Sequence, residues 1–451
     1  MQSLFGTDGI RGKVTSGFFS TASLIHAGAA IGRWACARHG HRPTLIIGYD
    51  TRYSAQHIKQ ALIEGLTQVP VDILDAHIIP TPAAAHLLQC MPHVAAAIII
   101  SASHNDAQDN GIKLFDQKIG KLTSQDELDI TRYYHEESDA SRTEKAPSLH
   151  GCVLPLSHAS ATYVQHLYTE IIKSCTPLVP TPNYHVVLDV AYGAMAHIAT
   201  QVFEKCGAKV TTLHSTPDGY NINQQAGSTD PRALQAAVIR EKADLGFAFD
   251  GDGDRVVAVN KHGQLKNGDD LLYLLLTHPD YAHTPSVVGT IMTNGGLEHA
   301  LAQQNKTLLR TPVGDRFIMD ALNREKLLLG GEPVGHIILR NHLYTGDGLL
   351  VALKILETIA ITSNWDMTTF THYAQASYKL PIEKRPNLTN EPFAQIIQNA
   401  QELITPGRVL VRYSGTEPVL RITTEAEDVS RAHKECGTLV DILQNAFKEL
   451  P

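Results

Sequence analysis

DLGFAFDGDGDR (residues 244–255) joins a short apolar segment to a loop in which aspartate and glycine alternate. A tight glycine loop can bring the carboxylates of Asp250, Asp252 and Asp254 to one point, where they repel one another unless a cation lies between them. Hard oxygen ligands favour magnesium. The spacing therefore predicts one Mg²⁺ at these aspartates; the alternative is an acidic surface turn.

Apolar, strand-like segments alternate with helix-like segments through the first three-quarters of the chain. The apolar segments do not alternate with polar residues, which predicts strands that are buried on both faces of α/β layers. Strands are predicted at 44–50, 71–76, 95–101, 185–193, 208–214, 244–249, 286–294 and 308–312, and helices near 54–66, 197–206, 231–242, 296–304 and 315–325.

The texture of the sequence changes after about residue 366. GRVLVRYS and EPVLRITTEA read as strands around a turn, and an amphipathic helix is predicted over 430–450. The fold class predicted is α/β, with three consecutive mixed-sheet domains of similar plan and a smaller C-terminal α+β domain. The predicted domains are 1–150, 151–258, 259–365 and 366–451, with the polar stretch 135–148 as the first linker.

Composition excludes several classes of protein. The chain has 451 residues, 43% hydrophobic and 19% charged, which is typical of globular domains. Its net charge of -8 argues against a nucleic-acid partner, and no apolar run reaches the roughly 18–20 residues of a membrane span. The six cysteines lack CxxC spacing and the first residues lack a secretory signal, so we expect a cytoplasmic protein.

SASHNDAQDNGIK (residues 101–113) offers a serine, a histidine and a lysine within one short stretch. A serine hydroxyl is a weak nucleophile until a base or a metal activates it. The stretch lacks G-x-S-x-G, which does not favour a hydrolase. Alone it reads as a turn at the end of a strand. With a magnesium loop elsewhere in the chain, Ser103 is better interpreted as a serine that carries a phosphoryl group.

Two other loops carry polar groups suited to a phosphosugar. RYSGTEPVLR begins at Arg412 and ends at Arg421, and arginine forms bidentate contacts with phosphate oxygens. The alternative is a hairpin turn with surface charges. GGEPVGH places Glu332 and His336 on a glycine-rich turn, where they are suited to bind sugar hydroxyls. Sites in open α/β sheets form beyond the carboxyl ends of strands, where the aspartate, serine and GGEPVGH loops fall.

Taken in order, these motifs resemble those of the α-D-phosphohexomutase superfamily, and most closely its bacterial phosphoglucosamine mutases. The resemblance covers nearly the whole chain. The motifs that carry it are FGTDGIRG (5–12), SASHN with DNGIK (101–113), NINQQAGST (221–229), FDGDGDR (249–255), PVGDRF (312–317), GGEPVGHII (330–338), TGDG (345–348) and RYSGTEP (412–418).

The resemblance implies four domains around a central cleft, with Ser103 as a phosphoserine that binds Mg²⁺ together with Asp250, Asp252 and Asp254. The catalytic residues it implies are Ser103, His104, Lys113, Arg11, Arg255 and His336. The substrate-binding residues it implies are Glu332, Thr311, Gly314, Arg412, Ser414, Gly415, Thr416 and Arg421.

The implied activity is the interconversion of glucosamine 6-phosphate and glucosamine 1-phosphate, through a hexosamine bisphosphate that is also the activator. The implied partner is a small phosphosugar, without nucleic acid or membrane, and the assembly to test is a homodimer. By the same resemblance, the product feeds UDP-N-acetylglucosamine and cell-wall synthesis.

Two departures from the family pattern keep alternatives open. Asp106 stands where the family has proline, and Val334, preceded by Pro333, stands where the sugar loop usually has serine. Valine cannot hydrogen-bond a sugar hydroxyl, and an unpaired polar partner costs about 1–3 kcal/mol. The alternatives are a phosphoglucomutase or phosphomannomutase, and a catalytically weakened phosphosugar-binding protein.

Overall fold

The computed structural model describes residues 3–6, 8–118, 120–139, 151–174, 184–414 and 417–449. The chain forms two compact units. The first comprises residues 1–288 and 311–368, and the second comprises residues 289–310 and 369–451. Within the described ranges the strands form four sheets, the first three with mixed or parallel pairing and the last antiparallel.

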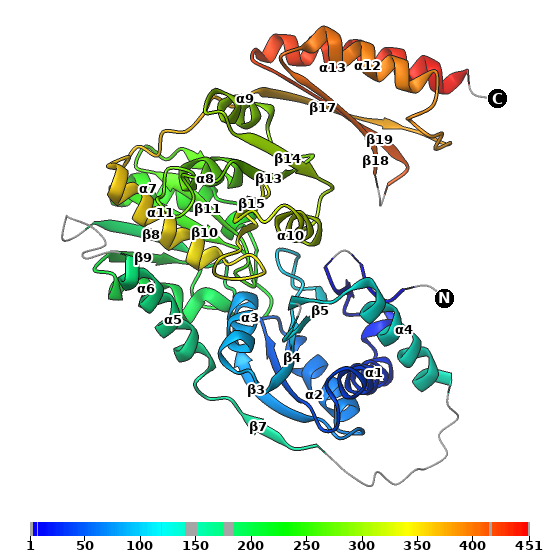
Figure 1. Cartoon of the computed structure of the whole chain (residues 1–451), viewed down its shortest axis with the longest axis vertical. Coiled ribbons are helices and arrows are strands. Elements are labelled where there is room, and N and C mark those ends of the chain that lie inside the picture. The colour runs from blue at the N-terminus through cyan, green and yellow to red at the C-terminus, as the bar shows by residue number, and fades with distance from the viewer. Residues whose placement is uncertain are drawn as a thin grey trace. The chain divides into compact units, whose positions relative to one another are not determined.

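The first sheet has the strand order β1-β5-β4-β2-β3-β7, with β6 beside β5. Every residue of β4 is buried, because β4 lies between β2 and β5 and has helices on both faces (Figure 1). Its strands are β1 (Ile10–Lys13), β2 (Thr44–Tyr49), β3 (Asp72–Ile78), β4 (Val94–Ile100), β5 (Asp109–Asp116), β6 (Gly120–Lys121) and β7 (Val153–Pro155). The helices of this region are η1 (Gly17–Phe19), α1 (Thr21–His39), α2 (Ala55–Leu66), α3 (Thr81–Cys90), α4 (Ser124–Asp139) and α5 (Ala159–Ser174).

The second and third sheets repeat the pattern of a central parallel pair with an antiparallel strand added. Their orders are β12-β11-β10-β8-β9 and β14-β13-β15-β16. Their strands are β8 (His185–Asp189), β9 (Lys209–Leu213), β10 (Leu245–Phe249), β11 (Val256–Asn260), β12 (Leu265–Lys266), β13 (Ser286–Thr290), β14 (Thr307–Thr311), β15 (Leu329–Gly331) and β16 (Ile337–Leu339). Their helices are η2 (Ala194–His197), α6 (Ala199–Lys205), η3 (Gly227–Thr229), α7 (Arg232–Glu241), α8 (Gly268–Leu275), α9 (Gly295–Gln303), α10 (Asp315–Arg324) and α11 (Gly348–Thr362).

The C-terminal sheet belongs to the second unit and has the order β17-β19-β18. Its elements are β17 (Ala374–Pro381), α12 (Phe393–Ile404), β18 (Arg408–Tyr413), β19 (Val419–Ala426) and α13 (Val429–Lys448). Both helices cover one face of the sheet, and Leu420, Ile422 and Leu443 lie in the core between them (Figure 1). The predicted α+β domain is confirmed.

Most predicted elements are present with shifted ends. The predicted strands at 185–193 and 286–294 are too long, since β8 ends at Asp189 and β13 at Thr290. After β8 the backbone turns at Ala191 and Tyr192, which have positive φ, and after β13 a turn is closed by the hydrogen bond from the Thr293 N–H to the Thr290 carbonyl. Elements that were not predicted are the helices α1, α3, α4, α5, α8, α11 and α12, and the strands β1, β5, β6, β7, β11, β12, β15, β16 and β17. Helix α4 extends to Asp139, into the predicted linker at 135–148, and the rest of that linker lies outside the described residues.

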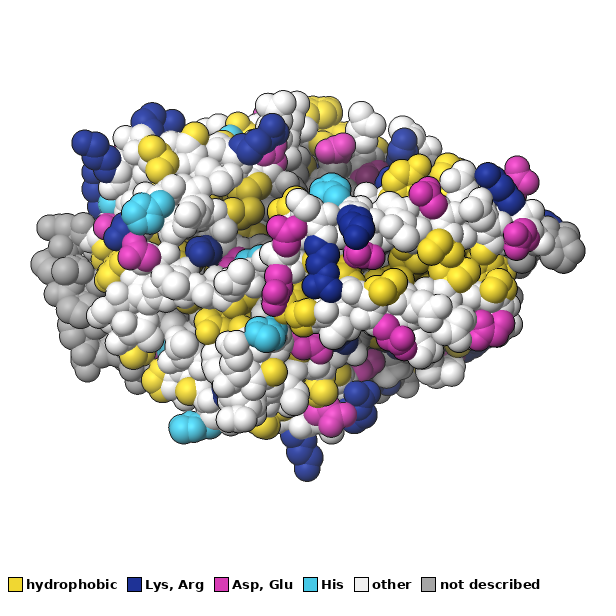
Figure 2. Space-filling view, turned by 90° about the horizontal axis from the view of Figure 1, so that it is seen from above, with side chains coloured by type: hydrophobic (Ala, Val, Ile, Leu, Met, Phe, Trp, Pro, Cys, Tyr) yellow, Lys and Arg dark blue, Asp and Glu magenta, His cyan; other side chains and the backbone are white. Residues whose placement is uncertain are grey.

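Surface charge agrees with the composition. On the face shown in Figure 2, acidic and basic side chains are interspersed instead of gathered by sign. Among the helices of the described ranges, none has the length and apolarity that a membrane crossing requires.

Helices α1 and α2 pack backbone to backbone at two glycines. A Cβ atom on Gly65 would lie 2.0 Å from the carbonyl oxygen of Ile25, and one on Gly28 would lie 2.2 Å from that of Leu62. No side chain fits at such distances. These two helices cover the first sheet, so the glycines set how closely that layer packs.

We expect Gly65→Ala to lower the free energy of unfolding by about 1–3 kcal/mol, because the methyl group forces the two helices apart. The measurement is thermal or urea unfolding followed by circular dichroism. Gly437→Ala is the matched control: Gly437 lies in α13, and among the described residues nothing comes within 4 Å of the added carbon, so alanine should stabilise that helix slightly. Equal stability of Gly65→Ala and the wild type would contradict the packing described here.

Candidate active site

Ser103 follows β4 and is completely buried. Its hydroxyl donates a hydrogen bond to Oδ2 of Asp250 at 2.7 Å. Its backbone is left-handed, with φ of 56°, a conformation that costs a non-glycine residue about 1–2 kcal/mol. The predicted serine loop and the predicted metal loop are therefore in direct contact, although they lie on two different sheets.

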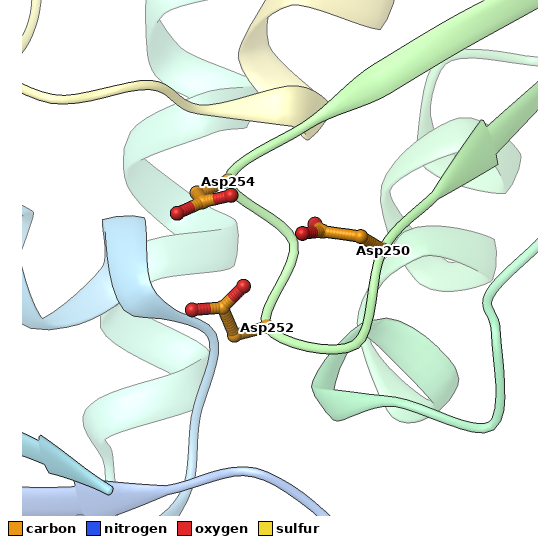
Figure 3. A group of neighbouring side chains, drawn as sticks. All are labelled: Asp250, Asp252 and Asp254. Carbon is orange, nitrogen blue, oxygen red and sulfur yellow. The ribbon is translucent and has the colours of Figure 1, made fainter. Parts of the chain in front are cut away.

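The three aspartates lie on the loop between β10 and β11, and their side chains point toward one another (Figure 3). One carboxylate oxygen from each lies within 4.8 Å of the others, and all three residues are buried. The Oδ1 atoms of Asp252 and Asp254 have no hydrogen-bond partner among the described residues. Buried oxygens of this kind need a ligand, so the donor set fits a hard divalent cation.

Electrostatics differ among the three carboxyls. Burial and the charges of Asp254 and Asp252 raise the pKa of Asp250 well above its usual value. Burial would also raise the pKa of Asp254, but Lys113 and His336 hold it well below the usual range. A cation beside Asp250 would favour its ionised form.

A glycine next to the first aspartate permits the contact between the loops. A Cβ atom on Gly251 would lie 2.6 Å from the carbonyl oxygen of Ser103. The alternation of glycine with aspartate therefore serves the close approach of the serine loop as well as the turn itself.

Lys113 lies on β5. Its place in the stretch from SASHN to DNGIK reads as a loop position in the sequence, and the structure differs from that. Its ammonium donates hydrogen bonds to Asp252 at 2.8 Å and Asp254 at 2.9 Å, and it lies 3.2 Å from Asp8. Burial would lower the pKa of Lys113, but these three carboxylates raise it above its ordinary value. Lys113 is thus held as a cation that donates hydrogen bonds.

Arg11 lies on β1, the neighbour of β5, and reaches the same region. It forms an ion pair with Asp8 and donates a hydrogen bond to the carbonyl oxygen of Ala102 at 3.2 Å. Asp8 in turn contacts Lys121 at 3.1 Å. The motif FGTDGIRG thus supplies both a cation near the serine loop and the carboxylate that orients it.

His104 lies beside Ser103, with Nδ1 3.4 Å from the serine hydroxyl oxygen. Burial, Arg255 and Arg11 lower the pKa of His104 to about 4. The imidazole is therefore neutral near pH 7 and adds no positive charge to a site that is already rich in lysine and arginine.

Arg255 and His336 meet through an isolated backbone bridge. Nε of Arg255 lies 3.8 Å from carboxylate oxygens of both Asp250 and Asp254. Nδ1 of His336 lies 3.6 Å from Asp254, and its Nε2 accepts a hydrogen bond from the Gly346 N–H at 3.2 Å. Gly346 of the TGDG motif thus fixes the orientation of the His336 ring.

The predicted sugar loop lies against the predicted PVGDRF loop. Glu332 is buried and accepts a hydrogen bond from the Gly314 N–H at 3.1 Å. Thr311 is also buried, and its hydroxyl donates to the carbonyl oxygen of Pro312. Val334, by contrast, is 50% exposed. Glu332 therefore sits inside the fold while the valine faces outward.

The predicted phosphate loop belongs to the second unit. Arg412 of β18 and Arg421 of β19 are directly opposite each other in the register, and Lys379 of β17 is opposite Arg421. Like charges opposite one another are unfavourable unless an anion separates them. The carboxylate of Glu417 pairs with Lys379 at 3.1 Å and with Arg421 at 3.0 Å. Ser414 is buried and its hydroxyl accepts a hydrogen bond from the N–H of Glu417. Gly415 and Thr416 lie outside the described residues.

Several residues around Ser103 were not predicted from the sequence. Asp50 and Arg52 follow β2, and Asn223 follows β9 within NINQQAGST. All three are buried and contact the serine loop through hydrogen bonds. The place of Asp50 and Arg52 beyond the carboxyl end of a buried strand was a signal that could have identified them.

Comparison with known proteins agrees with this geometry. Models of the phosphoglucomutase/phosphomannomutase family match the chain in order. They are the α/β/α domain I (residues 2–141), α/β/α domain II (161–263), α/β/α domain III (267–377) and the C-terminal domain (380–442).

A phosphoglucosamine mutase of Hydrogenovibrio crunogenus is 38% identical over 98% of this chain and 98% of its own length. A phosphoglucomutase/phosphomannomutase family protein from Burkholderia thailandensis has a crystal structure similar to this fold. Its TM-score is 0.78, its identity is 20%, and the match covers 98% of both chains. An N-acetylphosphoglucosamine mutase of Aspergillus fumigatus, solved with GlcNAc-6P and magnesium, has a TM-score of 0.65 and 17% identity, covering 99% of this chain and 96% of its own.

Full-length similarity at this identity shows the family, and the structural matches show the same fold. The chain belongs to the phosphoglucomutase/phosphomannomutase family of the α-D-phosphohexomutase superfamily.

Proposed function

We propose that this chain is a phosphoglucosamine mutase, which interconverts glucosamine 6-phosphate and glucosamine 1-phosphate through a phosphoserine at Ser103. The observation that carries the proposal is the contact of the Ser103 hydroxyl with Asp250, inside a group of three buried carboxylates. The names of full-length relatives support the substrate. The proposed compartment is the cytoplasm, as the cysteine spacing predicts.

In the first half-reaction, the bond between the Ser103 oxygen and phosphorus breaks and a bond forms from phosphorus to a sugar hydroxyl oxygen. Lys113, which is present as an ammonium, is proposed to give a proton to the departing serine oxygen. His336 is proposed to take the proton of the sugar hydroxyl on Nε2, once the Gly346 N–H releases that atom. Arg255 and Arg11 offset the charge of the transferred group. The product is a hexosamine bisphosphate.

In the second half-reaction, the bisphosphate presents its other phosphoryl group and Ser103 takes it back. The roles of acid and base reverse, as microscopic reversibility requires. A protein of the same fold, the Aspergillus fumigatus N-acetylphosphoglucosamine mutase, was solved as a serine-to-alanine variant in complex with glucose 1,6-bisphosphate. That complex supports a bisphosphate as the intermediate proposed for this chain.

Asp250, Asp252 and Asp254 would hold Mg²⁺, because two of their buried oxygens have no hydrogen-bond partner in the described part of the chain and hard oxygen ligands suit this ion. When bound, Mg²⁺ supplies Lewis-acid polarisation of the phosphoryl oxygens. Lys113 bridges Asp252 and Asp254, and the hydroxyl of Thr81 donates to Asp252 at 2.6 Å, while Asp250 accepts the hydrogen bond of Ser103.

Val334 bears on the choice among glucosamine, glucose and mannose phosphates, because it stands where the sugar loop of the family usually has serine. Its side chain is half-exposed and has no hydrogen-bonding group. Glu332 and Thr311 are proposed as the residues that bind the sugar beside it. Turnover of glucosamine, glucose and mannose phosphates, compared side by side, identifies the substrate. Binding of a sugar phosphate without turnover, even after addition of a hexose bisphosphate, would instead indicate the weakened binding protein.

Ser103→Ala should abolish mutase turnover, because no oxygen remains to carry the phosphoryl group. The measurement is glucosamine 1-phosphate formation with Mg²⁺ and a hexosamine bisphosphate activator. Intact mass should show an added phosphoryl group on the wild type only. Ser138→Ala is the matched control, since Ser138 is exposed on α4 and its hydroxyl donates to the carbonyl oxygen of His135. Full turnover by Ser103→Ala would refute the mechanism.

Asp252→Asn should weaken Mg²⁺ binding by about 100-fold or more, because even outer partners of metal ligands change affinity by about 10–100-fold. Isothermal titration with MgCl₂ measures this without substrate. Asp366→Asn serves as control, since Asp366 is exposed and pairs with Lys261. If the two variants bind Mg²⁺ with the same affinity as the wild type, the assignment of the aspartates as ligands fails.

Arg412→Ala should raise KM for the sugar phosphate by about 10–100-fold, since a charge-assisted hydrogen bond is worth about 1.5–3 kcal/mol. The proposed role of this arginine, with Arg421 and Ser414, is to hold the phosphate that does not react. Steady-state kinetics measure KM. The control is Arg431→Ala on α13, whose guanidinium binds the carbonyls of Leu403 and Thr405. Unchanged KM in Arg412→Ala would remove this loop from the substrate site.

A further inference from the structure

We propose that Arg52 and Asn223 are positioning residues that hold Ser103 in its left-handed conformation and so aim its hydroxyl at Asp250. The inference rests on the proposed function, because it concerns how the same serine is placed for phosphoryl transfer. Neither residue lies in the motif that contains Ser103.

The side chain of Arg52 uses all five of its N–H groups on the serine loop and its support. Nε donates to Asp50 at 2.9 Å. The two terminal nitrogens donate to four backbone carbonyl oxygens. The partners are Ser103 (3.0 Å), Asn105 (2.7 Å), Asp109 (2.9 Å) and Asp106. Only a planar guanidinium offers five donors in a fixed fork.

The N–H of Ser103 is held by the same unit. It donates to the hydroxyl oxygen of Ser101 at 2.8 Å, and that hydroxyl donates to Asp50 at 2.6 Å. Asp50 also accepts the hydrogen bond from Nε of Arg52. The amide and the carbonyl of Ser103 are therefore both tied to one buried Asp–Arg pair.

Asn223 is the second residue that holds the loop. Its Nδ2 donates to the carbonyl oxygens of Ser103 at 2.9 Å and Asn105 at 3.0 Å. Two donors are needed here, so the amide nitrogen must face the loop. Asn223 follows a strand of the second sheet, whereas Arg52 follows a strand of the first. The serine loop is thus held by residues that follow strands of two different sheets. We call Arg52 and Asn223 together the clamp.

The clamp compensates for backbone strain. A non-glycine residue with positive φ persists only where its surroundings hold it. Without the clamp, Ser103 would relax toward negative φ and its hydroxyl would leave Asp250. Arg52 is 2% exposed and Asn223 is 8% exposed, so neither offers a surface to the substrate. Their loss should therefore lower kcat and leave KM nearly unchanged.

The first test is Arg52→Lys, which keeps the charge and removes the fork. A misplacement near 1 Å costs about 10²-fold in rate, so kcat should fall by about 10–100-fold with KM within about threefold. The matched control is Arg310→Lys. Arg310 also binds two carbonyls and a carboxylate, but those of Thr290, Thr293 and Glu298. An unchanged kcat, or a loss carried by KM, would overturn the proposal.

The second test changes one atom of Asn223. Asn223→Asp places a carboxylate against two carbonyl oxygens, so kcat should fall further than in Asn223→Ala. Asn221→Asp is the control, two residues away, with Nδ2 on the carbonyl of Thr216. In the double variant Arg52→Lys/Asn223→Ala, the loss should be smaller than the product of the single losses, since both act on one loop. If kcat is the same in Asn223→Asp and Asn223→Ala, the role of Nδ2 of Asn223 as a hydrogen-bond donor would be contradicted.

Hydrogen exchange separates this proposal from the proposed function. Exchange of the amides of residues 101–110, read by mass spectrometry without substrate, should be faster in Arg52→Lys and Asn223→Asp than in the wild type and the controls. If the wild type converts no hexose phosphate, the proposed function fails, yet faster exchange would still support the clamp. Equal exchange in all proteins would overturn the clamp whatever the activity. An Arg52 variant that does not fold leaves Asn223→Asp to decide.

Discussion

Three carboxylates within 4.8 Å of one another, all buried, are the constraint on which the rest of this structure depends. Ionised side chains so close repel strongly where water is excluded. In the first unit, cations from separate parts of the chain offset this repulsion. They are Lys113 on β5 and Arg255 at the end of the loop. Asp8 and Lys121 continue the alternation of charge away from the site. The folded chain therefore supplies part of the positive charge that a metal ion would complete.

This charge pattern explains why the serine loop must be rigid. Ser103 reaches Asp250 in a left-handed conformation, and a Cβ on Gly251 would lie 2.6 Å from its carbonyl oxygen. Small movements of the loop would either break the hydrogen bond or clash with the aspartate loop. Arg52 satisfies four carbonyls at once, which is how a loop of polar residues can be buried without unpaired backbone groups.

Much of this could be predicted from sequence because local patterns carry it. Apolar runs of strand length predicted β4, β8 and β10, and the alternation of glycine and aspartate predicted the metal loop. What could not be predicted depends on distant partners. Lys113 looks like a loop residue until β5 is seen to pair with β4, and only that register turns its ammonium toward the aspartates. Arg52 was not predicted, because four of its five hydrogen bonds go to carbonyl oxygens about 50 positions away. Only its place beyond the carboxyl end of β2 could have pointed to it.

The same logic separates phosphoryl transfer from the choice of sugar. Asp50, Arg52, Asn223 and Asp250 are buried and hydrogen-bonded to the serine loop, so a change at one of them affects the whole network. Val334 is half-exposed, whereas Glu332 in the same loop is fixed by the Gly314 N–H. The loop can therefore vary at the valine while it keeps its carboxylate in place. As the proposed sugar loop, it would allow the preference among hexose phosphates to change at the valine without disturbing the proposed phosphoryl-transfer centre.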